Sequence, residues 1–103
     1  MAIDFVKLRQ KIPNFPGVYL MQDRQARILY VGKAGDLRRR VASYFERPQD
    51  ARIARMLTKV AKIDFQKTAT VIEALILEAE LIKRYSPQYN IKDKDDRSFL
   101  YVI

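Results

Sequence analysis

The 103-residue sequence contains no cysteine and no histidine. Without cysteine there can be no disulfide, thiolate nucleophile or cysteine-based zinc site. Without histidine, an enzyme that works by proton transfer must take its base from Tyr, Lys, Asp or Glu, and any metal must bind to oxygen ligands. The candidates for chemistry are therefore phenols, amines, guanidinium groups and carboxylates.

Long hydrophobic runs are also missing. No apolar stretch approaches the roughly 18 residues of a membrane span, and the N-terminus lacks the hydrophobic segment of a signal peptide. We therefore expect a cytoplasmic protein with no membrane partner. The length predicts one domain over residues 1–103, built around a single core.

Acidic residues are few relative to basic ones. Twelve Asp and Glu face twenty Lys and Arg, which gives a net charge of +8 and a pI near 9.9. Residues 1–35 carry six basic and two acidic side chains, residues 36–62 eight and three, and residues 63–103 six and seven. The basic excess in the first two segments favours a partner with negative charge, although arginines that merely solvate helix surfaces are the alternative.

The hydrophobic periodicity predicts an α/β (α+β) domain, a small central three-stranded antiparallel sheet flanked by helices. A hairpin occupies GVYLMQDRQARILYVG, with DRQAR as its loop, and KIDFQKT alternates as a third strand. The tail from residue 90, NIKDKDDRSFLYVI, is predicted to be a charged loop followed by a short edge strand. Helices are expected from Asp4 to Pro13 and over residues 36–45, 50–61 and 71–85.

The hairpin reads GVY on entry and YVG on exit. If the loop centres between residues 24 and 25, Tyr19 lies opposite Tyr30, and Gly17 lies opposite Gly32. Both phenols then share one face beside two residues without side chains, where another backbone could approach. The opposite, aliphatic face is expected to be the core. A preference of tyrosine for strands and of glycine for strand ends would explain the same residues without a functional site.

Two further features indicate a site. Arg40 lies one turn before Tyr44 on a predicted helix, so the two share a face that Arg38 and Arg39 do not. In the longest predicted helix, the neighbours of Glu78 at three and four positions are all apolar. A lone carboxylate in a core stripe is costly unless it is paired, protonated or bound to a metal, so Glu78 is either functional or the partner of an arginine.

These residues together resemble the GIY-YIG nuclease family, with Val in place of Ile in both halves of the hairpin motif. The match is closer to the nucleotide-excision-repair branch: YVGKAGDLRRRVASYF resembles its YVGKAxxLxxRVxSYF, and EALILEAELIKRYSPQYN resembles its EALLLExNLIKxxxPxYN. KDDRSF resembles its RDDKSY. The resemblance covers about residues 13–99. Three positions depart from the pattern: Glu80 for Asn, Phe99 for Tyr and Leu100 for Pro.

The resemblance implies the GIY-YIG fold and a metal-dependent endonuclease that cuts DNA on the 3′ side of a lesion. It further implies that one Mg²⁺ or Mn²⁺ is held by Glu78, and that the partners are damaged double-stranded DNA and a UvrB-type damage-loading protein. The chain is then expected to be an N-terminal fragment of a longer protein.

The resemblance also assigns roles to single residues. Tyr19 and Tyr30 orient and deprotonate the attacking water with Lys33, and Tyr19 is slightly preferred as the base. Arg40, with Tyr44 nearby, steadies the developing phosphate charge, and Asn90 supports the site. Contacts to DNA are expected from Gly32, Lys33, Arg38, Arg39, Arg40, Arg52 and Arg55.

Two alternatives remain open at this stage. A GIY-YIG nuclease could serve another duty, as a stand-alone or homing-type enzyme. A non-catalytic, basic nucleic-acid-binding module would explain the charge, but it would not explain Glu78, because an acid near a phosphate track weakens binding.

Overall fold

A computed structural model describes residues 4–90, and the edge strand predicted in the tail lies outside this range. Three strands form one antiparallel sheet in the order β2-β1-β3, so the first strand is central. This confirms the predicted fold class. The elements are α1 (Phe5–Lys11), β1 (Gly17–Gln22), β2 (Ile28–Ala34), α2 (Leu37–Glu46), α3 (Ala51–Lys59), β3 (Lys62–Lys67) and α4 (Val71–Tyr85).

Side-chain caps define where the helices begin. Asp4, Asp36 and Asp50 each accept a hydrogen bond from a backbone N–H in the first turn of α1, α2 and α3. Thr70 and Glu73 form the predicted capping box at the start of α4. No helix within residues 4–90 has the length and apolarity needed to cross a bilayer.

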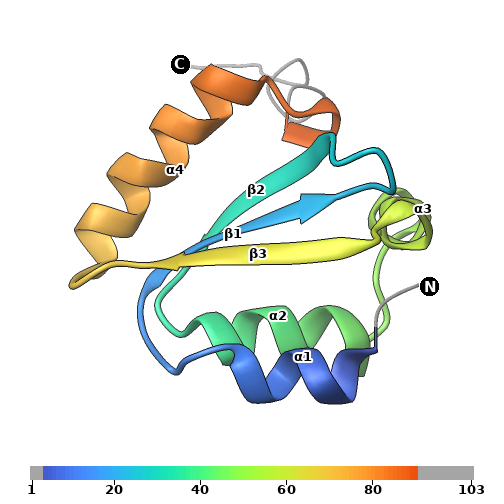
Figure 1. Ribbon diagram of the computed structural model, residues 1–103, viewed down its shortest axis with the longest axis horizontal. Helices are drawn as coiled ribbons and strands as arrows, with labels where there is room; N and C mark the ends of the chain where they lie inside the picture. The colour runs from blue at the N-terminus through green and yellow to red at the C-terminus, as the bar shows by residue number, and fades with distance from the viewer. Residues whose placement is uncertain (1–3, 91–103) are drawn as a thin grey trace.

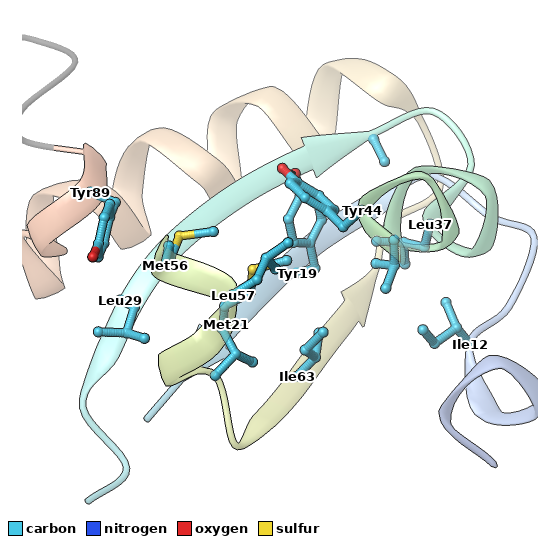
Figure 2. Close-up of a cluster of buried hydrophobic side chains, with 13 residues drawn as sticks. Ile12, Tyr19, Met21, Leu29, Leu37, Tyr44, Met56, Leu57, Ile63 and Tyr89 are labelled. Carbon is cyan, nitrogen blue, oxygen red and sulfur yellow. The ribbon is translucent and has the colours of Figure 1, made fainter. Parts of the chain in front are cut away.

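Helices cover both faces of the sheet (Figure 1). The helices α1 and α2 lie on one side, and α4 lies across the other side, against β2 and β1. The larger cluster of buried side chains is on the side of Tyr19, which Figure 2 shows packed among aliphatic residues from α2, α3 and the strands. Val18 and Val31 on the aliphatic face are buried, as predicted. Tyr19 on the opposite face is buried as well, so the core also includes the tyrosine face.

The register of the hairpin differs from the predicted one by two residues. Tyr19 pairs with Gly32, and Tyr30 pairs with Met21. Asp23 closes the loop by accepting hydrogen bonds from two backbone N–H groups, and an irregularity after Met21 then shifts the pairing. Because the shift is even, both tyrosines keep the same face, as predicted.

The two glycines are therefore not opposite each other, and a side chain is excluded at each position for a separate reason. A Cβ on Gly17 would overlap the carbonyl oxygen of Gln66 on β3. A Cβ on Gly32 would overlap the ring and hydroxyl of Tyr19, so this glycine makes room for the phenol and not for an incoming backbone.

Replacement of Gly32 by Ala should lower the free energy of unfolding by about 1–3 kcal/mol, because the added methyl displaces the buried Tyr19 ring. Gly35→Ala is the matched control: the nearest atom to its Cβ is Val71 Cγ2 at 3.8 Å, an ordinary contact. Urea denaturation of both variants measures the difference. Equal stability losses would show that the Tyr19 ring does not depend on the missing side chain.

Candidate active site

Two phenols meet at the end of the buried cluster. Tyr19 comes from β1 and Tyr44 from α2, and their hydroxyl oxygens lie 2.7 Å apart. The two rings pack edge to face, with centroids 5.8 Å apart. Figure 2 shows both hydroxyls directed to the same point, away from the aliphatic side chains. This hydrogen bond ties the central strand to α2 at the predicted site.

Arg40 completes this cluster from α2. Its Nε donates to the Tyr19 hydroxyl and its Nη2 to the Tyr44 hydroxyl, both at 3.4 Å. The guanidinium carbon lies 5.1 Å from the centroid of the Tyr44 ring. The predicted shared face of Arg40 and Tyr44 is confirmed, and two phenol oxygens hold the guanidinium.

Burial sets the ionisation of this cluster. It raises the pKa of Tyr19 well above its ordinary value near 10, and the neighbouring Tyr44 raises it further, while the hydrogen bond from Arg40 opposes the shift. Burial alone would lower the pKa of Arg40, but the phenols, above all Tyr19, raise it. At neutral pH the pair is thus a neutral phenol beside a guanidinium cation.

Tyr30 and Lys33 approach the site from β2. The Tyr30 ring centroid is 6.2 Å from that of Tyr19, and its side chain is half-buried, whereas Tyr19 is 1% exposed. Lys33 Nζ lies 3.7 Å from Glu78 Oε1. The hairpin motif therefore brings one buried phenol, one more accessible phenol and one ammonium to the same end of the sheet.

Glu78 lies on the face of α4 that is turned to the sheet, with a side chain 17% exposed. The helix is less buried than its sequence predicts: only Ala74 is fully buried, and Leu75 is exposed. Glu78 is thus at the margin of the core and not inside it. Its cationic neighbour is Lys33, not one of the arginines considered from the sequence.

The donor set fits a hard divalent cation held by few protein ligands. Among residues 4–90 no group of three or more Asp, Glu, His or Cys side chains converges. Mg²⁺ commonly binds through one or two carboxylates and keeps water and phosphate oxygens as its other ligands. The partly open Glu78 carboxylate can provide such a site, whereas a zinc site would need more protein ligands.

The side-chain hydrogen bonds of Asn90 are to the backbone of β2 and not to the phenols or Glu78. Its buried side chain accepts from the Val31 N–H at 2.8 Å and donates to the Val31 carbonyl at 3.0 Å. The amide thus pairs with the outer edge of β2 as a neighbouring strand would. These two hydrogen bonds fix the backbone between Tyr30 and Gly32.

The predicted DNA-binding cations separate into two groups. Arg38 Nε donates to the Ile12 carbonyl at 2.7 Å, and Arg52 Nη2 donates to the Tyr89 carbonyl while its guanidinium lies over the Tyr89 ring. Both are used within the fold. Arg39 and Arg55 are exposed.

Arg47 was not among the site residues predicted from the sequence. A groove beside α2 is lined by Arg47 together with Lys33, Arg39 and Arg40. The signal was present in the sequence, because Arg47 follows Arg40 by seven residues and two helical turns bring such residues to one face.

The fold and the hairpin motif define a GIY-YIG domain. Residues 15–91 match the family described as the UvrC-like GIY-YIG domain, and the chain belongs to this family. Similar curated proteins include the UvrABC system protein C of Synechocystis sp., 55% identical over 90% of the chain, and that of Rhizobium meliloti, 48% identical over 96%.

A solved structure supports the same assignment. The GIY-YIG N-terminal endonuclease domain of UvrC from Thermotoga maritima, bound to its catalytic divalent cation, magnesium, is 34% identical, with a TM-score of 0.77. The match covers 86% of this chain and 98% of that domain. By contrast, the chain spans only 15% and 14% of the length of the Synechocystis and Rhizobium proteins.

Tyr19→Phe should weaken the alkaline decline in stability. The folded state keeps the Tyr19 proton where the unfolded chain releases it, above a pH of about 10. The stabilisation is therefore complete below that pH and is lost as the pH rises further. Urea denaturation from about pH 9 to 12 measures the slope. Tyr85→Phe, at an exposed tyrosine, is the control. A Tyr19→Phe slope equal to that of the wild type would contradict the raised pKa of Tyr19.

Proposed function

We propose that this domain is a metal-dependent DNA endonuclease that hydrolyses a phosphodiester bond on the 3′ side of a lesion during nucleotide excision repair. The observation that carries the proposal is a groove lined both by Arg40, which two phenols hold, and by Lys33, the ion-pair partner of Glu78. Family membership supports the nuclease class, and the UvrC relatives support the repair duty over a stand-alone or homing duty.

Glu78 would hold one Mg²⁺ or Mn²⁺. The bound cation would supply Lewis-acid stabilisation of the phosphate charge. The solved Thermotoga domain, whose catalytic cation is magnesium, supports this choice. Lys33 Nζ, 3.7 Å from Glu78 Oε1, would supply a second positive charge beside Arg40 in the groove.

Tyr30 is the better general base on the geometry of the site, in place of the initially preferred Tyr19. Tyr19 is buried, its hydroxyl is engaged by Tyr44 and Arg40, and its pKa is raised, so it holds its proton. A base must reach the water whose proton it accepts. Tyr30 is half-buried on the same face and meets this requirement better.

Arg40 stabilises the transition state. Hydrolysis adds negative charge to the non-bridging oxygens of the phosphate, and a guanidinium that is already oriented meets this charge without further reorganisation. The hydroxyls of Tyr19 and Tyr44 provide that orientation. Tyr19 then acts through Arg40 and not on the water.

The partners follow from this duty. Damaged double-stranded DNA is the substrate. A UvrB-type protein delivers this DNA, and it contacts regions that the longer relatives have and this chain does not span. The name UvrABC system protein C, which the relatives carry, supports a multi-protein repair system. Such a duty places the domain in the cytoplasm.

Glu78→Gln should abolish metal-dependent nicking, because the amide removes the anionic ligand while it preserves the shape. Stability in metal-free buffer should change by less than about 1 kcal/mol, since the Lys33–Glu78 pair is partly exposed and such pairs contribute little. A plasmid-nicking assay in Mg²⁺, paired with urea denaturation, measures both effects.

The control for this substitution is Glu80→Gln, at an exposed glutamate two residues along α4, which should nick like the wild type. A Glu78→Gln variant that still nicks would overturn the metal site. A variant that unfolds about 3 kcal/mol more easily would instead show a structural ion pair.

Arg40→Ala should lower kcat by about 10²-fold or more, because one preorganised charge at the transition state is lost. Arg39→Ala should lower kcat much less, since Arg39 does not contact the phenols. Multiple-turnover nicking at saturating DNA measures kcat and separates the two. Equal losses in kcat from both substitutions would indicate a diffuse basic patch in place of a defined catalytic arginine.

A further inference from the structure

We infer that Arg47 and Arg39 bind phosphates of the DNA strand beyond the one that is cleaved, along the groove beside α2. This inference deepens the proposed function and rests on it. It assigns Arg47, at the C-cap of α2, a role in substrate binding, and it sets the direction in which the strand leaves the catalytic site.

The spacing of the cations matches a phosphate backbone. Arg40 lies at the phenol cluster, and Arg47 lies two turns later on the same side of α2, about 10 Å further along the helix axis. Phosphates of one B-DNA strand rise by about 3.4 Å each along the duplex axis and lie further apart along the strand itself, so this length spans no more than about three phosphates. Arg39 lines the same groove and lies one position before Arg40 on α2.

The carboxylates in the groove are already occupied. Both oxygens of Asp36 accept from Asn14 Nδ2, at 3.1 and 3.2 Å, and one of them also caps α2. Glu46 is 3.7 Å from Arg9, toward α1. Within residues 4–90 neither Arg39 nor Arg47 has an acidic partner, so their charges are available to an external anion.

The backbone at Arg47 is braced. Its N–H donates to the Ser43 carbonyl at 3.2 Å, and its carbonyl accepts from Gln49 Nε2 at 3.2 Å. Gln49 Nε2 also donates to the Ser43 carbonyl, at 3.1 Å. The end of α2 is therefore fixed, and the Arg47 side chain projects from a rigid support. Arg38 and Arg52, in contrast, are engaged by backbone carbonyls.

Salt-dependent binding tests the inference. Fluorescence anisotropy in metal-free buffer measures the affinity of each variant for a short labelled duplex over a series of salt concentrations. Each lost phosphate contact lowers the slope of log K against log salt by about 0.9. Arg47→Ala and Arg39→Ala should each reduce the slope by about one, and the double variant by about two.

Arg24→Ala is the matched control, because Arg24 is an exposed arginine in the loop at the other end of the hairpin. It removes the same charge and should keep the wild-type slope. A loss from Arg24→Ala equal to that from Arg47→Ala would overturn the inference, since binding would then follow net charge alone. An unchanged slope for Arg47→Ala would overturn it as well.

The two proposals can fail separately. If the wild-type domain nicks DNA in Mg²⁺ but Arg47→Ala binds like the wild type, the groove assignment fails and the nuclease stands. If no nicking occurs but Arg47→Ala lowers the salt slope and Arg24→Ala does not, the groove stands and the catalytic proposal fails.

Discussion

The hydrogen bond between the hydroxyls of Tyr19 and Tyr44 is the interaction on which the site depends. Two buried phenols must satisfy their polar atoms, because an unpaired buried hydroxyl costs free energy. They do so with each other and with Arg40, which fixes α2 against the central strand and orients the guanidinium in one step. The missing side chain of Gly32 provides the space for this arrangement.

The site therefore separates orientation from chemistry. Tyr19, Tyr44 and Asn90 hold other groups in place: the first two hold Arg40, and Asn90 holds the backbone at Val31. In the proposed mechanism Tyr30 and Arg40 act on the reacting groups. A neutral phenol is a suitable support for a guanidinium, because a carboxylate in its place would neutralise the charge needed at the phosphate.

The elements and the shared face of the phenols could be predicted from the sequence, because alternation, helical spacing and capping residues are local signals. The register could not, since it depends on how Asp23 closes the loop and on an irregularity after Met21. The inward use of Arg38 and Arg52 was also hidden, because it requires carbonyls that only the folded chain brings near. Glu78 was selected as a candidate site residue because of its apolar neighbours, although α4 is more exposed than these neighbours suggest.

In the proposed mechanism Tyr19 orients Arg40 while Tyr30 takes the proton. Single-turnover nicking in Mg²⁺ by Tyr19→Phe and Tyr30→Phe tests it most directly. Tyr30→Phe should lower the rate by about 10²-fold or more, as expected for the loss of a general base. Tyr19→Phe should lower the rate by only about ten- to thirtyfold, because it removes two hydrogen bonds, with Tyr44 and from Arg40, of about 1 kcal/mol each. A Tyr30→Phe variant that nicks faster than Tyr19→Phe would contradict the role of Tyr30 as the general base.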